Sequence, residues 1–525
     1  MLRLASLALL AWGLGTASSV WAEAKPPADI DDYAARVLKT FAVPGLSVGI
    51  VKDGKLVFAK GYGVRKLGES APVDENTLFP IGSNTKAFTS ALLASLVDAG
   101  KLSWDDPVYQ RLPGFQMYDP YVSHEMTIRD LLTHRSGMGL GEGDLLFWPT
   151  TTYTRDEIIY KLRFMKPASS FRSGFAYDNL MYIAAGQIIP AVTGATWESY
   201  VRTEVLDPLG MKTTTLSAAE FKASANHAYP HQRLDGVLRA IDFVSLDNAA
   251  PAGSISSSVV EMAKWVQLQL NRGAFPDGKR LFSAAQSKEM WTAQTILPNR
   301  ENPGPLGHLK SNYAAYGLGW FLREYQGHQV VEHTGGVAGF VSRVMLVPEQ
   351  NLSVVILTNA ESSGAFDAIL YHVLDQYFGA PKTDWVAAFK SNEDQQSTTA
   401  ASFMKDQDAH RDSGAKPALA LEKYAGVYQD AWYGPATVRQ ENGGLVFTLD
   451  HTPAAVGDLQ YWQYDTFKAH WRDRSMEDAF LTFTLKPDGS IDHFTMKAVS
   501  PLADFSFDYQ DLLFTPLEKK NSPGD

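Results

Sequence analysis

The feature that most constrains the fold is the position of the strand patterns, which form two groups far apart in the sequence. Two apolar runs near the N-terminus, 45–51 and 56–63, flank Asp53-Gly54, a dipeptide typical of a tight β-hairpin. Strand patterns return only much later, at 317–323, 329–333, 342–347 and 352–357. Helical patterns fill the chain between the two groups. This order predicts one antiparallel sheet whose two parts pair across a helical insertion.

Helical periodicity and helix-end signals predict helices on the faces of this sheet. A buried helix is expected from 83 to 99, because apolar residues recur at helical spacing and Gly100 follows. Another is expected from 258 to 271, where Ser258 and Glu261 have the spacing of a capping box. Further helices are expected at 32–41 and 366–378. The segment from 104 to about 250 is predicted to be an all-helical insertion, because its short helical stretches are separated by Gly- and Pro-bearing loops.

The composition of the chain changes after residue 380. Residues 381–418 are polar, which predicts a linker or a solvated helix. From 419 to 520, short alternating apolar runs and turns at Asn442-Gly443 and Asp488-Gly489 predict a second, antiparallel domain that resembles a β-barrel. The predicted fold class is therefore α+β for residues 23–380, followed by an all-β domain.

The N-terminus and the composition indicate where the protein works. Residues 1–22 have the pattern of a secretory signal peptide, with Arg3, an apolar stretch over 4–14 and the cleavage pattern Val20-Trp21-Ala22. The alternative is an uncleaved membrane anchor, but the apolar stretch is too short to span a membrane. No later segment is expected to span one, so no stable membrane insertion is expected after removal of the signal peptide. The 525 residues include no Cys, which excludes disulfides and cysteine nucleophiles, and the net charge of −11 argues against nucleic-acid binding. We expect a periplasmic or secreted bacterial protein.

The first motif with chemical meaning is Ser83-Asn84-Thr85-Lys86, at the start of a predicted helix. Spacing of three places Ser83 and Lys86 on one helix face. A serine hydroxyl is a weak nucleophile until a neighbouring base takes its proton. Lys86 can act as that base only if burial or another cation lowers its pKa.

Two later motifs carry partners for such a pair. In Tyr177-Asp178-Asn179, the phenol of Tyr177 is suited to relay a proton, and the amide of Asn179 is suited to bind Lys86 or a substrate. The segment His333-Thr334-Gly335-Gly336 ends a predicted strand. Glycine there permits close approach of a substrate, and an exposed N–H can stabilise an oxyanion.

Three other patterns are weaker. Gly45-Leu46-Ser47-Val48-Gly49 matches a nucleophile elbow, but no helix follows, so Ser47 is interpreted as a strand residue. His227 and His231 have metal-ligand spacing, but Pro230 breaks the helix they would need. The glycines from 137 to 143 lack a phosphate-loop Lys and are interpreted as a loop that lines the site. No metal or organic cofactor is expected.

The three motifs, in this order, resemble the serine β-lactamase and penicillin-binding superfamily, specifically its class C β-lactamase-like branch. The resemblance covers about residues 30–380. Four further segments are similar to that family: Leu131-Leu132-Thr133-His134-Arg135-Ser136-Gly137, Pro208-Leu209-Gly210-Met211, Ala252-Gly253-Ser254 and Tyr316-Gly317-Leu318-Gly319-Trp320.

The resemblance implies a role for each motif residue. Ser83 would be the nucleophile of an acyl-enzyme, Lys86 and Tyr177 its acid/base pair, and Asn179 a substrate-positioning residue. Backbone N–H groups would form an oxyanion hole, with each donor worth about 3 kcal/mol. The donors implied are those of Ser83 and Gly336. The remaining substrate-binding residues implied are His333, Thr334 and Gly335.

The third motif also departs from the family, because many relatives have Lys where this chain has His333. Histidine has a reference pKa of about 6.5 and is often neutral at neutral pH, so it is poorly suited to a β-lactam carboxylate. The departure therefore favours the peptidase, amidase or esterase members of the family. The resemblance implies peptides that contain D-amino acids as the first expected substrates, because members of that family act on such peptide ends and an exported enzyme meets cell-wall peptides. A small-acyl esterase, a β-lactamase and a non-catalytic sensor or binding protein remain as alternatives.

The last 100 or so residues resemble the lipocalin-like β-domain found in some members of this hydrolase family. Residues 421–428 and Trp462-x-Tyr464-Asp465-x-Phe467 carry this resemblance. It implies a domain that caps the active site, mediates homo-oligomerisation or binds an apolar ligand in the barrel mouth. A purely stabilising domain is the alternative.

Overall fold

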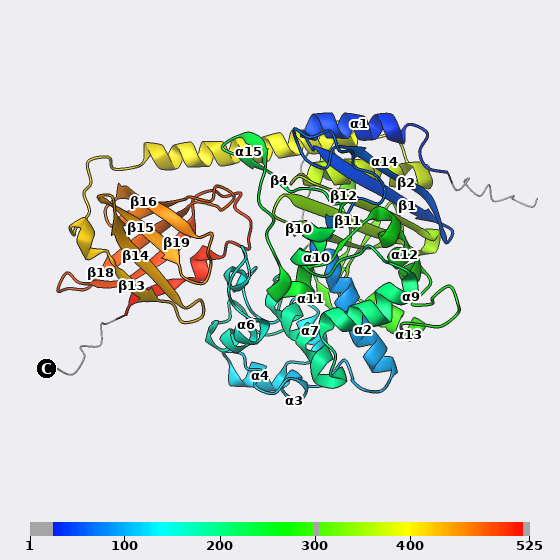
Figure 1. The fold of residues 1–525 in the computed structure, drawn as a ribbon, viewed down its shortest axis with the longest axis horizontal. Coiled ribbons are helices and arrows are strands. Elements are labelled where there is room, and N and C mark those ends of the chain that lie inside the picture. The colour runs from blue at the N-terminus through cyan, green and yellow to red at the C-terminus, as the bar shows by residue number, and fades with distance from the viewer. Residues whose placement is uncertain (1–24, 299–303, 518–525) are drawn as a thin grey trace, which may run out of the picture.

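The computed structural model describes residues 25–298 and 304–517. The predicted signal peptide, residues 1–22, lies outside the described residues. The described chain forms a large α/β domain and a smaller β-barrel, and the long helix α15 (Trp385–Ala409) runs from one to the other (Figure 1). The helix is one of the two alternatives that the polar segment 381–418 had left open.

The α/β domain is built on one eight-stranded antiparallel sheet. Its strand order is β2-β1-β12-β11-β10-β9-β8-β7. The N-terminal hairpin therefore joins the late strands, with Ser47 of the first strand opposite Leu357. This confirms the predicted pairing across the insertion. The strands are β1 (Gly45–Lys52), β2 (Lys55–Gly63), β7 (Thr295–Ile296), β8 (Ala314–Tyr316), β9 (Phe321–Tyr325), β10 (His328–Val337), β11 (Phe340–Val347) and β12 (Leu352–Thr358).

Helices cover both faces of the sheet. Successive side chains of its central strands β1 and β12 point to opposite sides and are buried at every position, so both faces need a covering layer. The helices α1 (Ile30–Phe41), α14 (Ser363–Phe378) and the start of α15 pack on one face. The helices α2 (Thr85–Asp98) and α12 (Val259–Leu270) share a core with the other face. The expected helices at 32–41, 83–99, 258–271 and 366–378 all have counterparts here.

The inserted region carries most of the remaining helices. They are α3 (Val108–Arg111), α4 (Pro120–Glu125), α5 (Ile128–Leu131), α6 (Arg155–Lys161), α7 (Asn179–Thr193), α8 (Trp197–Val201), α9 (Asp207–Leu209), α10 (Ala218–Ala223), α11 (Ala250–Gly253) and, after the insertion, α13 (Ala284–Met290). The region is not all-helical as predicted, since β4 (His231–Leu234) and β5 (Val237–Ala240) form a hairpin. Asp235 and Gly236 both have positive φ, as a tight hairpin turn requires. A two-stranded sheet also joins β3 (Phe79–Pro80) to β6 (Ser256–Ser257).

Two local expectations need correction. The predicted strand at 317–323 is a turn followed by β9, because Gly319 has φ 84° and Gly317 N–H donates to Trp320 O. The expected capping box at α12 is only half formed. Ser258 caps the helix by accepting from Glu261 N–H, but the Glu261 carboxylate turns away and accepts from Thr214 N–H at 2.7 Å.

The C-terminal domain is a closed eight-stranded antiparallel barrel. Its interior is filled by aromatic side chains, with Phe494 at ring-centroid distances of 4.9 Å from Phe483 and 4.8 Å from Phe514. The barrel therefore has a packed core, which argues against an apolar ligand in its interior. Its strands are β13 (Gly426–Gln429), β14 (Pro435–Glu441), β15 (Gly444–Leu449), β16 (Val456–Gln463), β17 (Thr466–Trp471), β18 (Ala479–Leu485), β19 (Ile491–Ala498) and β20 (Leu513–Pro516).

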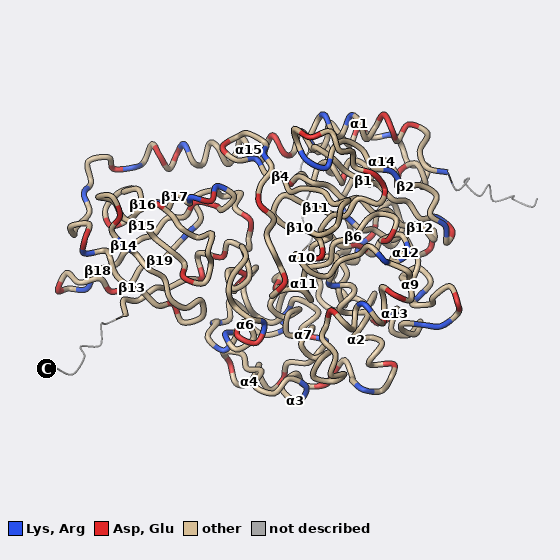
Figure 2. The backbone as a smooth tube through the Cα atoms, viewed as in Figure 1, with Lys and Arg blue, Asp and Glu red and all other residues tan. Residues whose placement is uncertain are grey.

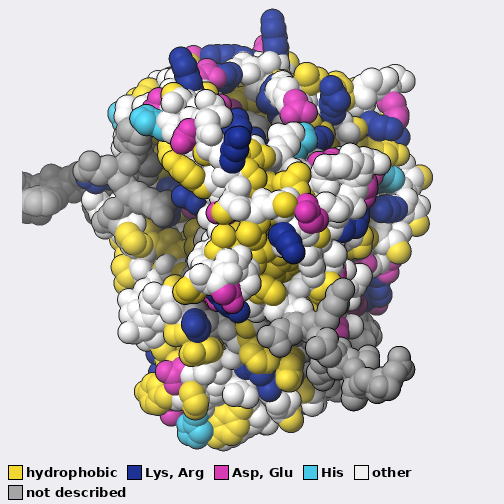
Figure 3. Space-filling model, turned by 90° about the vertical axis from the view of Figure 1, so that its left-hand side faces the viewer, with side chains coloured by type: hydrophobic (Ala, Val, Ile, Leu, Met, Phe, Trp, Pro, Cys, Tyr) yellow, Lys and Arg dark blue, Asp and Glu magenta, His cyan; other side chains and the backbone are white. Residues whose placement is uncertain are grey.

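The charges are spread over both domains. Lys and Arg are interspersed with Asp and Glu over the whole of the described chain (Figure 2). On the barrel end of the molecule, hydrophobic side chains are interspersed with charged ones of both signs (Figure 3). Within the described residues, no helix is both long enough and apolar enough to span a membrane.

Candidate active site

Ser83 and Lys86 lie at the start of α2 and contact each other. Ser83 is in the short turn η1 (Gly82–Asn84) that leads into the helix, and it is partly exposed. Lys86 is fully buried, and its Nζ donates to Ser83 Oγ at 2.9 Å and to Ala252 O at 3.1 Å. Burial lowers the pKa of Lys86 to about 7. A lysine with that pKa is able to be neutral at neutral pH and to accept the serine proton.

Tyr177 lies beside the same pair. The Lys86 ammonium is 4.8 Å from the centre of the Tyr177 ring, and Tyr177 lines the same cleft as Ser83. Burial raises the pKa of Tyr177 well above its usual value, so it remains a phenol. The ring stacks on His134, with centroids 4.1 Å apart. His134 is fully buried, so this stack holds the Tyr177 ring in place.

Asn179 is the third partner of Lys86. Its Oδ1 accepts from Lys86 Nζ at 2.7 Å, and its Nδ2 donates to Asp144 Oδ2 at 2.8 Å. Asp178 caps α7 by accepting from the N–H groups of Leu180 and Met181, which fixes Asn179 as the first residue of that helix. Sequence analysis did not single out Asp144. Its one signal was the preceding Gly-rich segment, 137–143, which was interpreted as a loop that lines the site.

The third motif lies on β10, directly against η1. A Cβ on Gly335 would lie 1.9 Å from Ile81 O, so only glycine allows this close approach. A Cβ on Gly336 would meet nothing within 4 Å, and this residue is exposed. Thr334 and Gly336 both line the cleft next to Ser83.

His333 has a different position from the rest of its motif. It is buried, is not among the cleft-lining residues, and its Nε2 is 2.9 Å from the Tyr316 hydroxyl. Burial, followed by the Lys86 charge, lowers the pKa of His333 to about 3. The neutral imidazole therefore packs beneath the site, and it supplies no cation for a substrate carboxylate.

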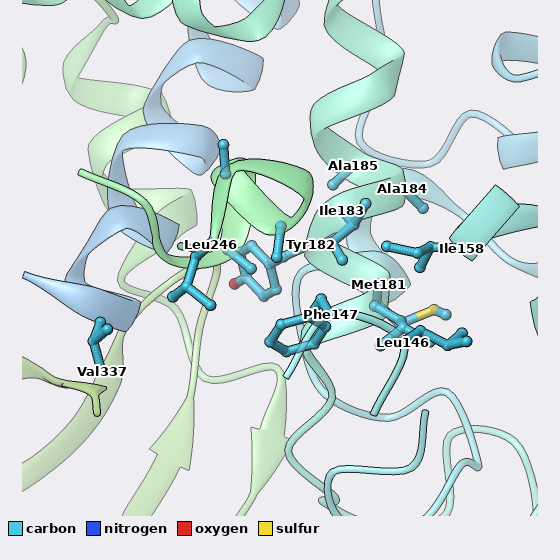
Figure 4. Packing of buried hydrophobic residues seen from close by; sticks show 14 of the residues in the cluster. Leu146, Phe147, Ile158, Met181, Tyr182, Ile183, Ala184, Ala185, Leu246 and Val337 are labelled. Atoms are coloured by element: carbon cyan, nitrogen blue, oxygen red, sulfur yellow. The ribbon is translucent and has the colours of Figure 1, made fainter. Parts of the chain in front are cut away.

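A cleft of about 550 Å³ opens beside Ser83, and its lining also includes Tyr177, Asn179, Thr334 and Gly336. Its lining includes the aromatic pair Phe147 and Trp148. Phe147 and Leu246 belong to the same hydrophobic core as Met181 and Tyr182 of α7 (Figure 4). This apolar wall is continuous with the interior of the inserted helical region, which keeps it rigid.

The C-terminal barrel forms the opposite part of the lining. Its segment between β19 and the turn η9 (Tyr509–Asp511) reaches the α/β domain, and the Phe505 ring lies 5.9 Å from the ring of Tyr177. Three carboxylates line the cleft, and no Lys or Arg does so within the described chain. They are Glu361 of the α/β domain and Glu477 and Asp504 of the barrel.

The chain matches two known sequence families. Residues 30–377 match the model described as Beta-lactamase, and residues 410–516 match a domain of unknown function (DUF3471). The first match covers the sheet, the helical insertion and all three motifs.

Individual relatives and solved structures extend this comparison. The unguisins hydrolase ungD' of Aspergillus campestris is 32% identical over 428 residues, covering 78% of this chain and 77% of the relative. The octameric penicillin-binding protein homologue from Pyrococcus abyssi has a TM-score of 0.59 at 21% identity, covering 93% of this chain and 99% of that one. A D-stereospecific amidohydrolase from Streptomyces sp. has a TM-score of 0.51 at 21% identity, covering 67% of this chain and 100% of that one.

Proposed function

The chain belongs to the β-lactamase family and is a serine hydrolase, and on this basis we propose that Ser83 forms its acyl-enzyme. The observation that carries the proposal is the buried ammonium of Lys86, which donates to both Ser83 Oγ and Asn179 Oδ1. A buried lysine with a pKa of about 7 has no evident purpose in a purely structural role, because its desolvation is unfavourable.

The proposed chemistry assigns the base and the acid separately. Neutral Lys86 takes the proton from Ser83 Oγ as that oxygen bonds to the substrate carbonyl carbon. The N–H groups of Ser83 and Gly336 stabilise the resulting oxyanion. Tyr177, a neutral phenol, gives its proton to the leaving nitrogen or oxygen and regains one from the Lys86 ammonium as the bond to the leaving group breaks. Water then hydrolyses the acyl ester through the reverse proton transfers.

We propose amides of D-amino acids, including peptides that contain them, as the first substrate class. A structural neighbour described as a D-stereospecific amidohydrolase supports this choice, and a relative described as an unguisins hydrolase supports a hydrolytic reaction. The lining of the cleft argues against β-lactams, because their carboxylate would face Glu361, Glu477 and Asp504 without a cation. Esters of the same acyl groups would pass through the same intermediate.

Covalent labelling tests the nucleophile directly. A fluorophosphonate should add one label to the wild-type protein, detected by intact mass, and none to Ser83→Ala. Ser47→Ala is the matched control, because Ser47 also sits in a Gly-x-Ser-x-Gly pattern but is buried in β1. Equal labelling of wild type and Ser83→Ala would overturn the assignment.

Turnover tests the substrate class. Paired D- and L-amino acid amides of the same side chain should differ in kcat/KM, with the D-amide preferred.

We propose in addition that the protein is exported and that residues 1–22 are removed, which N-terminal sequencing of protein from a bacterial periplasm would check.

A further inference from the structure

The barrel is joined to the catalytic centre by direct polar contacts. Ser506, in the segment between β19 and η9, donates from Oγ to Asp144 Oδ2 at 2.8 Å, and both residues are buried. Two residues further on, the Asp508 carboxylate accepts from Gly143 N–H at 2.6 Å and from Leu145 N–H at 3.1 Å. The barrel therefore holds both the side chain of Asp144 and the backbone on either side of it.

Asp144 connects Ser506 to Asn179, which in turn contacts Lys86. The same Oδ2 that accepts from Ser506 also accepts from Asn179 Nδ2 at 2.8 Å. Asn179 Oδ1 accepts from Lys86 Nζ at 2.7 Å, and Lys86 Nζ donates to Ser83 Oγ at 2.9 Å. Four consecutive hydrogen bonds thus connect Ser506 of the barrel to Ser83 of the α/β domain.

Within the described chain, few groups donate a hydrogen bond to the Asp144 carboxylate, and Ser506 is one of them. Asp144 is fully buried, and its other oxygen, Oδ1, has no hydrogen-bond partner among the described residues. Ser506 and Asn179 are therefore its two side-chain donors within the described chain. An amide that donates to a fixed carboxylate must present its oxygen in the opposite direction, so Asp144 sets which atom of Asn179 faces Lys86.

We propose that Ser506 is a positioning residue of the active site, which fixes Lys86 through Asp144 and Asn179, so that the barrel completes the catalytic centre of the α/β domain. This inference rests on the proposed function of Ser83 and Lys86. It assigns the barrel a role in the reaction itself, in addition to forming a wall of the cleft.

The electrostatics give the direction of the expected effect. Burial raises the pKa of Asp144, and the hydrogen bond from Ser506 opposes that rise. Without Ser506, Asp144 keeps its proton to higher pH, and the neutral acid no longer stabilises the Lys86 ammonium. The pKa of Lys86 then falls below its value of about 7. The other titratable groups around this pair are Asp178, Asp508, His134, His333, Tyr177 and Tyr182.

The test is the rate of fluorophosphonate labelling of Ser83 in the full-length protein, measured against pH. For Ser506→Ala we expect a rate about tenfold lower above neutral pH, as for loss of one hydrogen bond to a buried charged group. We also expect the acidic midpoint of the profile to move to lower pH. Ser506→Thr keeps the hydroxyl and should restore both values. Ser490→Ala, an exposed turn residue of the same barrel, is the matched control.

The outcomes separate this inference from the proposed function. If Ser506→Ala labels with the rate and midpoint of Ser490→Ala, the inference is wrong while Ser83 remains the nucleophile. If the wild type does not label, the proposed function fails and the inference fails with it. A slower rate with an unchanged midpoint in folded Ser506→Ala would indicate a merely structural contact and would also overturn the inference. Near-UV circular dichroism of each variant checks the fold.

Discussion

At the scale of single residues, the site depends on the desolvation of one lysine. Lys86 is surrounded by Tyr177, Asn179 and the carbonyl of Ala252, and burial is the largest influence on its pKa. Asp144 and Asp178 act in the opposite direction and keep that pKa near 7. The balance makes a base out of a residue that is normally a permanent cation.

A pH profile follows from this balance. Only neutral Lys86 can accept the Ser83 proton, so kcat/KM should rise with pH and level off above a midpoint near the pKa of about 7. Below it, the rate should fall about tenfold per pH unit, because one protonation blocks the base. Lys86→Arg should be inactive at every pH, since a guanidinium stays charged. Lys101→Arg, on the surface, serves as its control, and a flat acidic limb would contradict the assignment.

Tyr177 gives a second prediction at this scale. Tyr177→Phe keeps the stack on His134 but removes the hydroxyl that we propose as the proton donor to the leaving group. We expect kcat to fall about 10² to 10⁴-fold, the usual range for a general acid. The comparison uses amides and activated esters, because esters with good leaving groups should lose much less. Tyr121→Phe, an exposed tyrosine, should leave both activities unchanged.

At the scale of elements, the active site requires β10 to touch the turn that carries Ser83. The contact is made by Gly335 against Ile81 O, which also accepts hydrogen bonds from Ser342 Oγ and Asn84 Nδ2. This single approach places Gly336, whose N–H is one of the two proposed oxyanion donors, beside Ser83, the proposed nucleophile.

Substitutions at the two glycines of this motif should therefore differ. Gly335→Ala places a methyl group against Ile81 O and should destabilise the α/β domain by about 1 to 3 kcal/mol, as overpacking does. In Gly336→Ala the new methyl group meets open space, so this variant should unfold at nearly the same temperature as the wild type. Thermal unfolding of both variants provides the measurement. Equal stabilities would show that β10 can move away from η1 at little expense.

Local sequence signals predicted most elements, and they failed where a distant contact decided the outcome. The helix that follows Ser83, the late strands and the three motifs follow from periodicity, turn residues and spacing, which act over a few residues. Glu261 has capping-box spacing, yet it binds Thr213 and Thr214 instead, because the packing of a remote loop offers it three donors. Likewise, Gly319 forms a turn in a predicted strand. Its backbone lies against α2, where a Cβ added to Gly319 would be 2.7 Å from Ser90 Oγ.

At the scale of the whole molecule, the two domains share one cleft. The contact from Ser506 to Asp144 spans 362 positions in the sequence, and neither residue carries a local pattern that reveals it. The three motifs could be proposed as one site because their order along the chain resembles that of a known family, and the structure places Ser83, Lys86, Tyr177 and Asn179 next to one another. The barrel wall of that site could not be predicted, because it depends on how two separately patterned domains pack together.

The charge of this shared cleft leads to a prediction about substrates. Glu361, Glu477 and Asp504 come from both domains, and burial followed by their mutual repulsion raises the pKa of Glu361. A substrate with an ammonium group away from the scissile bond should thus have a kcat/KM about tenfold higher than a matched one with a carboxylate there. The preference should weaken in 0.5 M salt, a concentration at which the Debye length is roughly 4 Å.

Variants of the barrel wall distinguish this charge effect from shape. Asp504→Asn keeps the volume of the side chain but removes one negative charge from the lining, so the ratio of the two kcat/KM values should fall while the neutral parent substrate is unaffected. Asp492→Asn changes the same charge on an exposed part of β19 that does not line the cleft, and it should leave the ratio as in the wild type. Equal effects of the two variants would mean that net charge, and not the cleft wall, sets the preference. A preference that persists in Asp504→Asn at high salt would assign selectivity to the aromatic lining instead.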